Sequence, residues 1–218
     1  MKFFDYDPFT TFNSLFYQVF NGDAYVSLRT ELYSTKQDKE EKALAHSLDD
    51  SLSASLDDSL DRKSFIRCVQ ALNVVFPDFD FAELDPSSMI RLDSTRGAVC
   101  SLLESVVPEA GKQVGSASPT VFQPVASADY LGALGEAIPL NDAEAFAFEP
   151  DPASNPLEHA IFSSVLLLHA PTVHRMVVLV LEATVRRDGQ QGAQDVNADD
   201  DRPSMADDDD PMQFEMET

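Results

Sequence analysis

The amino-acid sequence predicts an α+β fold in a single domain, with a mainly antiparallel sheet covered by about three helices. Apolar residues alternate with period two near the N-terminus, and the same alternation returns late in the chain. Three segments with helical spacing lie between these two regions. We therefore expect the sheet to combine an N-terminal hairpin with the late strands. A hydrophobic content of 44% with 15 Phe is ample for the core of such a domain.

The N-terminal hairpin is predicted by a turn dipeptide between two apolar runs. Asn21-Gly22 readily adopts the positive φ angles of a two-residue hairpin turn. The apolar residues after the turn alternate with other side chains, which predicts one buried face: Val26, Leu28 and Leu32. The segment before the hairpin contains Phe9 and Phe12, and we expect it to form a short helix.

Three helices are predicted between the hairpin and the late strands. The first runs from Ser64, interpreted as its N-cap, to Pro77. The second extends from Ser94 to Pro108, and the third, with weaker periodicity, begins at Ser127. Proline ends the first two helices because it lacks a backbone N–H and clashes with the preceding turn.

The late strands begin with the stretch AEAFAFEPDP. Phe146 and Phe148 alternate with small or acidic residues, so we expect them to anchor a strand in the core. Pro150 is expected to end this strand, and Asp151 is expected to cap the turn that follows. Two further strands, joined by a turn at Ala170-Pro171, are predicted by β-branched residues over 161–168 and 173–185.

Composition divides the chain into four regions. Residues 1–36 and 64–187 are expected to form the globular domain, interrupted by an acidic, low-complexity, mobile insertion at 37–63. The insertion repeats SLDDSL, and its leucines recur every four residues, which also fits a partner-docking helix; the mobile acidic loop is favoured. Residues 188–218 are expected to be a disordered acidic tail.

The charge of the chain limits its partners. The formal net charge is −23, and the tail alone carries eleven acidic residues and one Arg. Such a surface repels phosphate backbones, so direct nucleic-acid binding is disfavoured and proteins with basic surfaces are favoured. Asp5 and Asp7 lie where a signal peptide would be apolar, and no apolar run approaches the ~20 residues of a membrane span.

Catalytic motifs are missing from the sequence. It contains no phosphate-binding loop, nucleophile elbow or zinc-binding helix motif, and its four His have no zinc-ligand spacing. His169 and His174 flank the late turn and are interpreted as solvated residues. Cys68 and Cys100 are interpreted as buried thiols rather than a disulfide or metal pair. We expect no cofactor, no metal and no enzymatic activity; a thiol hydrolase using Cys100 is a minor alternative.

Phosphorylation of the chain is the favoured chemistry. Ser47, Ser55 and Ser204 each have an acidic residue three positions later, a pattern typical of acid-directed kinase sites. Ser64 follows two basic residues, which suits a basic-directed kinase. The alternative is that these serines only resemble or form helix caps. An added phosphate would act through its negative charge.

The order of several local motifs resembles the Maf-one family, the eukaryotic repressors of RNA polymerase III transcription. The motifs are MKFF with FNS, then GDAYVSLRTELYSTK, FIRCVQALNVVFPDFDF, YLGALGEAI and FAFEPDPASNP. They lie within residues 1–36 and 64–185, on either side of the insertion. The family-motif and candidate partner-binding residues are Gly22, Asp23, Arg29, Tyr33, Asp78, Asp80, Phe146, Phe148, Pro150, Asp151 and Arg175.

The resemblance implies a regulator that binds the clamp region of RNA polymerase III and hinders its engagement with initiation factor IIIB. It also implies a switch by kinases and phosphatases acting on the insertion, with the dephosphorylated form repressing. We expect a monomer in the nucleus and cytoplasm, shuttling between them.

Two observations qualify these implications. The late strand pair departs from the family because it has few aromatic residues and no Lys/Arg cluster. This weakens the inference of polymerase contacts or a nuclear-localisation signal there. The alternative function, suggested by the tail, is an acidic chaperone-like binder of histones or other basic proteins.

Overall fold

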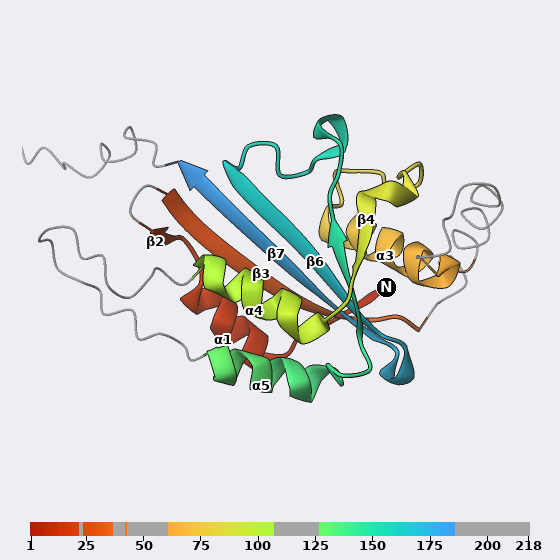
Figure 1. The fold of residues 1–218 in the computed structure, drawn as a ribbon, viewed down its shortest axis with the longest axis horizontal. Helices are drawn as coiled ribbons and strands as arrows, with labels where there is room; N and C mark the ends of the chain where they lie inside the picture. Colours follow the sequence, from red (N-terminus) through yellow and green to blue (C-terminus); the bar gives the residue numbers. More distant parts are fainter. Residues whose placement is uncertain (22–23, 37–41, 43–60, 107–126, 186–218) are drawn as a thin grey trace, which may run out of the picture. The chain divides into compact units, whose positions relative to one another are not determined.

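A computed structural model describes residues 1–21, 24–36, 42, 61–106 and 127–185 (Figure 1). The predicted acidic tail lies outside these residues, as does nearly all of the predicted insertion, including its leucine stripe. The helices and strands described below all belong to one unit, Met1–Arg186.

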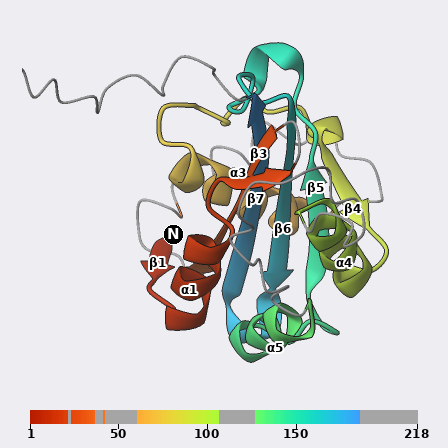
Figure 2. The same cartoon turned by 90° about the vertical axis from the view of Figure 1, so that its left-hand side faces the viewer.

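The strands form one seven-stranded antiparallel sheet in the order β1-β3-β7-β6-β5-β4, with β2 also pairing with β3. Figure 2 shows β3, β7, β6, β5 and β4 side by side in this order. The strands are β1 (Lys2–Phe4), β2 (Val19–Asn21), β3 (Ala24–Ser34), β4 (Met89–Leu92), β5 (Glu144–Phe148), β6 (Phe162–Ala170) and β7 (Arg175–Val185). The structure confirms the antiparallel sheet built from an N-terminal hairpin and late strands.

The longest pairing joins the two ends of the domain. β3 and β7 pair over eleven residues, from Ala24 opposite Val185 to Ser34 opposite Arg175. β2 pairs antiparallel with the start of β3, as the predicted hairpin requires. The segments before and after the insertion therefore share one sheet.

Four helices in the described residues cover both faces of the sheet: the short helix predicted before the hairpin and the three predicted between the hairpin and the late strands. They are α1 (Asp7–Leu15), α3 (Arg62–Val75), α4 (Thr95–Val106) and α5 (Ser127–Ala137). Alternate residues of β7 face opposite ways. Val177 and Leu179 pack with α1, α4 and α5, whereas Met176 and Val178 pack with α3. We call the first side the three-helix face and the second the α3 face.

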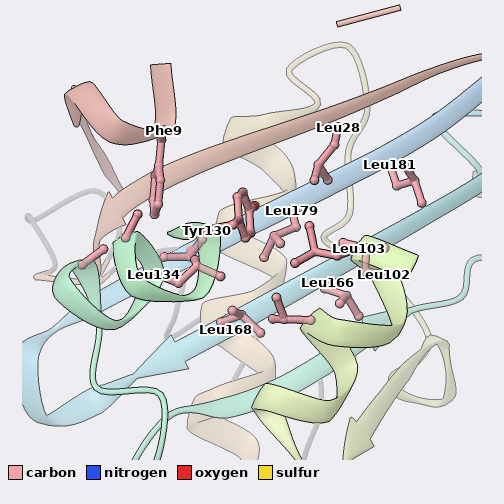
Figure 3. Close-up of a cluster of buried hydrophobic side chains, with 14 of the residues drawn as sticks. Phe9, Leu28, Leu102, Leu103, Tyr130, Leu134, Leu166, Leu168, Leu179 and Leu181 are labelled. Carbon is pink, nitrogen blue, oxygen red and sulfur yellow. The ribbon is translucent and has the colours of Figure 1, made fainter. Parts of the chain in front are cut away.

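The three-helix face has a mostly aliphatic core (Figure 3). Leu102 and Leu103 of α4 and Leu134 of α5 pack there with leucines of the sheet. Tyr130 of α5 is fully buried and shares a hydrogen bond with the hydroxyl of Thr30. This bond satisfies both hydroxyl groups, which would otherwise be costly to bury.

The core of the α3 face contains more aromatic side chains than that of the three-helix face. Phe146 and Phe148 are 1% and 5% exposed, which confirms that they anchor β5. Phe81 meets Phe148 edge to face, with ring centroids 5.6 Å apart. Cys68 of α3 is buried here as predicted, and burial raises the pKa of its thiol. Cys100 is also a free thiol but is only half-buried.

Asn13 of α1 closes a gap at the edge of the sheet. β1 pairs with the end of β3 and β2 with its start, so neither strand pairs with the middle of β3. There the Asn13 amide nitrogen donates to the Thr30 carbonyl at 2.9 Å, and the Asn13 amide oxygen accepts from the Thr30 N–H at 2.7 Å. One side chain thus replaces a strand residue, which gives the FNS motif a structural role.

One predicted cap is wrong, and the other is in the predicted position but makes no capping hydrogen bond through its side chain. α3 begins at Arg62, and its N-cap is Asp61, whose carboxylate accepts from the Ser64 N–H; Ser64 lies within the first turn. Aspartate caps helices as well as serine does, and helical spacing alone does not choose between them. Asp151 precedes a short 3-10 turn (Pro152–Ser154), but its side chain makes no capping hydrogen bond; its carbonyl accepts from the Ser154 N–H at 2.9 Å.

His169 and His174 were both predicted to be solvated residues beside the late turn. This prediction is wrong for His169 and confirmed for His174. β6 continues to Ala170, so His169 is a strand residue on the α3 face and is 7% exposed. His174 is exposed in the turn between β6 and β7, with a left-handed φ of 54°.

Candidate functional site

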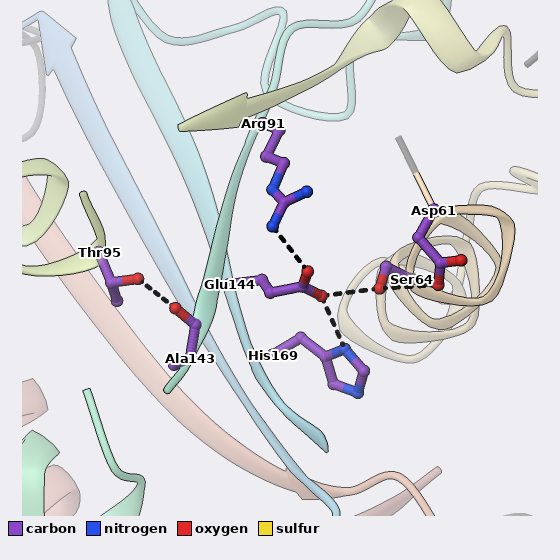
Figure 4. A network of polar contacts seen from close by, with 7 residues as sticks. All are labelled: Asp61, Ser64, Arg91, Thr95, Ala143, Glu144 and His169. Atoms are coloured by element: carbon purple, nitrogen blue, oxygen red, sulfur yellow. Dashed lines mark hydrogen bonds and ion pairs between the residues drawn. The ribbon is translucent and has the colours of Figure 1, made fainter. Parts of the chain in front are cut away.

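A polar cluster lies at the start of β5, on the α3 face (Figure 4). Its centre is Glu144, which stands opposite His169 of β6 in the sheet. One carboxylate oxygen, Oε1, accepts from Arg91 of β4 at 3.0 Å. The other, Oε2, accepts from the Ser64 hydroxyl of α3 at 2.8 Å and lies 3.8 Å from His169 Nδ1. Glu144 therefore connects three strands with the first turn of α3.

Ser64 is held between two carboxylates. Its N–H donates to Asp61 Oδ2 at 3.2 Å, and its hydroxyl lies 3.4 Å from the same oxygen. Its side chain is 3% exposed, although it lies only three residues after the helix cap. The first turn of α3 is thus attached to the sheet through a hydrogen bond to a charged acceptor, a stronger type than a neutral pair.

His169 contributes a neutral ring to the cluster. Burial lowers its pKa, and the nearby Glu144 carboxylate only partly opposes that shift. The imidazole is therefore uncharged at neutral pH.

A polar hollow of about 610 Å³ opens beside Glu144. Its walls include Arg91, Asp93, Thr95 and Asp142. Thr95 also donates to the Ala143 carbonyl at 2.6 Å, which ties the start of α4 to the entry of β5 (Figure 4). No group of three or more His, Cys, Asp or Glu in the described part of the chain could hold a metal ion. The helices described there also include none that could span a membrane.

Four motif residues gather at the other end of β5. Asp78 and Asp80 are exposed in the loop after α3, where Asp80 accepts from the Ala82 N–H at 2.9 Å. Pro150 and Asp151 follow β5, and the Glu149 N–H donates to the Ser88 carbonyl at 2.8 Å. This bond, together with the contact between Phe81 and Phe148, places both loops at one end of the sheet. The result is an acidic, solvent-exposed surface.

Two further motif residues lie on β3. Arg29 is exposed and pairs with Glu31 at 3.6 Å. Tyr33 is buried, donates its hydroxyl to Glu31 at 2.8 Å and meets Phe3 edge to face. Burial and the adjacent Glu31 raise the pKa of Tyr33.

Arg175 of β7 contacts both α5 and β1. It donates to the Ala137 carbonyl at the end of α5 at 2.7 Å, and its guanidinium lies 5.9 Å from the centroid of the Phe4 ring. Gly22 and Asp23 lie outside the described residues, as do the candidate phosphorylation sites Ser47, Ser55 and Ser204.

Sequence reasoning found Ser64 but missed Glu144, Arg91 and Asp61. A signal for Glu144 was present, because it has the same strand parity as Phe146 and Phe148. A carboxylate on the buried side of a strand requires a partner. Which residues provide that partner depends on strand order and register, and periodicity does not specify either.

A family model described as the Maf1 regulator matches residues 51–180, which include α3, the loop after it with Asp78 and Asp80, and the Glu144 cluster. The chain belongs to the Maf1 regulator family. The match confirms the resemblance seen in the sequence motifs. A search of curated protein sequences found no match.

Solved structures share the fold of this Maf1 regulator. Two crystal forms of citrus MAF1 superpose with TM-scores of 0.67 and 0.65, at 24% and 22% sequence identity. In both cases 82% of this chain is covered, together with 98% and 99% of the citrus chains. The arrangement of one sheet with helices on both faces is therefore that of a known Maf1 structure.

Proposed function

We propose that this chain represses RNA polymerase III transcription by binding the polymerase and hindering its engagement with initiation factor IIIB. The observation that carries the proposal is membership of the Maf1 regulator family across residues 51–180. In this proposal the chain acts by covering a surface of the polymerase rather than by catalysing a reaction.

We propose that the polymerase binds the acidic surface where β4 begins and β5 ends. Asp78, Asp80 and Asp151 are exposed there. Polymerases handle nucleic acid and present basic surfaces, so a chain with a net charge of −23 would be steered toward them. Steering of this kind mainly raises the association rate, and salt screens it.

Regulation is proposed to be by phosphorylation, with kinases and phosphatases as further partners. The dephosphorylated chain is the repressing form in this proposal. We also propose that the chain is a monomer that shuttles between nucleus and cytoplasm.

A second candidate function is an acidic chaperone-like binder of histones or other basic proteins. The observation that favours it is the tail, with eleven acidic residues and one Arg after position 187. Affinity capture from nuclear extract separates the two functions, because the first predicts recovery of polymerase III subunits and the second predicts recovery of histones.

Depletion of the protein tests the main proposal. Precursor transfer RNAs should rise after depletion and return to normal when the wild-type chain is restored. An unchanged level of nascent transfer-RNA precursors would count against the proposal.

Polymerase binding by surface variants tests the proposed contact surface. The double variant Asp78→Asn and Asp80→Asn should bind polymerase more weakly and with a smaller salt dependence than the wild type. Asp93→Asn with Asp142→Asn is the matched control, because it removes two exposed carboxylates beside the Glu144 hollow. Equal binding by both double variants would show that the surface is elsewhere.

A further inference from the structure

We propose that Ser64 is a phosphorylation site that Glu144 keeps closed, so that a kinase reaches it only when the first turn of α3 leaves the sheet. The phosphate would then hold that turn open. This inference goes beyond the proposed function, and it can be tested on the isolated chain whichever partner the chain binds.

The sequence before Ser64 fits a kinase, but the side chain itself is hidden. Arg62 and Lys63 precede Ser64, the pattern of a basic-directed serine kinase. Lys63 is exposed, whereas Ser64 is 3% exposed. The next two residues, Phe65 and Ile66, are also buried. A kinase cleft can therefore engage this segment only after the start of α3 has unpacked.

The closed state depends on the hydroxyl proton of Ser64. This proton is donated to Glu144 Oε2 across 2.8 Å, and Asp61 Oδ2 lies 3.4 Å from the same hydroxyl oxygen. Two carboxylate oxygens around one hydroxyl are compatible only while that hydroxyl can donate.

Phosphorylation replaces the attraction between Ser64 and the two carboxylates with repulsion. The γ-phosphoryl group of ATP is transferred to Ser64 Oγ, the hydroxyl proton passes to the base of the kinase, and ADP leaves. Oγ can then no longer donate, and a group with a charge of about −1.5 to −2 is placed beside Glu144 and Asp61. Repulsion and the cost of burying this charge both oppose a return to the closed position.

The helix dipole does not stabilise a phosphate on Ser64 in the closed position. An anion near the start of a helix is normally favoured because backbone N–H groups there are unpaired. Here the Ser64 N–H is already bound to Asp61, and Arg91 is already paired with Glu144. The phosphate would have to displace one of these carboxylates to gain either partner.

The rate of modification tests the closed state. The full-length wild type, Glu144→Ala and Glu149→Ala are incubated with ATP and a basic-directed serine kinase that phosphorylates a peptide of residues 58–70. Mass spectrometry then follows the phosphate on Ser64. Glu149 is the matched control because it is an exposed carboxylate just beyond the far end of β5. Near-UV circular dichroism reports whether each variant is folded.

The expected result is that Ser64 is modified about tenfold faster in Glu144→Ala than in the wild type or Glu149→Ala, given the loss of a hydrogen bond to a charged acceptor. Equal rates in folded Glu144→Ala and wild type would overturn the proposal. So would a wild-type rate equal to that of the peptide.

Hydrogen exchange tests the open state and does not depend on the stability of Glu144→Ala. Ser64→Ala removes the hydroxyl without adding charge, whereas Ser64→Asp adds a negative charge at the same position. Amides of residues 65–68 should exchange about tenfold faster in Ser64→Asp than in Ser64→Ala, with α5 unchanged in both. Equal exchange in the two variants would overturn the proposal.

Discussion

The two faces of the sheet are closed in different ways. Three helices cover one face, and its core is mostly aliphatic, with the hydrogen bond between Tyr130 and Thr30 at its centre. Among the described helices only α3 covers the other face, where a core richer in aromatic side chains adjoins the cluster around Glu144.

Because of this difference, we expect the three-helix face mainly to stabilise the domain and the α3 face to respond to changes in charge. Apolar burial on the three-helix face does not depend on charge and holds the domain together under varied conditions. The α3 face depends in addition on hydrogen bonds to ionised groups, which protonation or phosphorylation can change. Changes of state are therefore expected on the α3 face, next to the point where the chain returns from the insertion.

The largest expected effect comes from the core of the α3 face. Phe146→Ala should lower the free energy of unfolding by about 3–5 kcal/mol, because a large side chain that is 1% exposed leaves a cavity. Urea unfolding measures the change. Phe162→Ala is the control, since that side chain is 53% exposed and should cost within about 0.5 kcal/mol. Similar losses in both variants would contradict the assignment of Phe146 to the core.

A smaller effect is expected from the hydrogen bond of the three-helix face. Tyr130→Phe should lower the free energy of unfolding by about 1 kcal/mol, because the Thr30 hydroxyl loses its partner in a buried site. Thermal unfolding compares this variant with Tyr17→Phe, whose ring is 67% exposed. A change as small as that of Tyr17→Phe would mean that the bond contributes nothing to stability.

The smallest effect is a pH dependence confined to the α3 face. The folded-state pKa of His169 is lowered by burial, so the unfolded chain binds a proton more readily. Stability should therefore fall as the pH drops below the ordinary histidine pKa of about 6.5. Urea unfolding at several pH values should show a weaker dependence in His169→Gln. His174→Gln, at an exposed position, should keep the wild-type slope. Identical slopes in all three proteins would rule out the buried imidazole as the cause.

Periodicity was sufficient to predict most of the fold. The three central helices and the two long late strands each contain enough residues for a repeat to show. The hairpin was predicted mainly from the turn dipeptide Asn21-Gly22 between two apolar runs. β1 and β4 have only three and four residues, so they are too short to show a pattern. The placement of α3 on its own face follows from strand order, which local sequence does not specify.

The candidate site was predictable only in part. Ser64 was identified from the basic residues before it, but its burial against Glu144 results from contact between residues 80 positions apart. His169 was assigned to the edge of a turn because Pro171 follows two residues later, whereas the strand continues to Ala170. Cross-strand register, rather than any local motif, brings Glu144 and His169 together.

We propose that this Maf1 regulator represses transcription by binding RNA polymerase III. Transcription of a transfer-RNA gene, reconstituted with purified polymerase III and factor IIIB, tests it most directly. Adding the dephosphorylated chain before the polymerase joins the promoter should reduce the yield of transcript, while a polymerase II template remains unaffected. Undiminished transfer-RNA synthesis with an excess of folded protein would contradict the account.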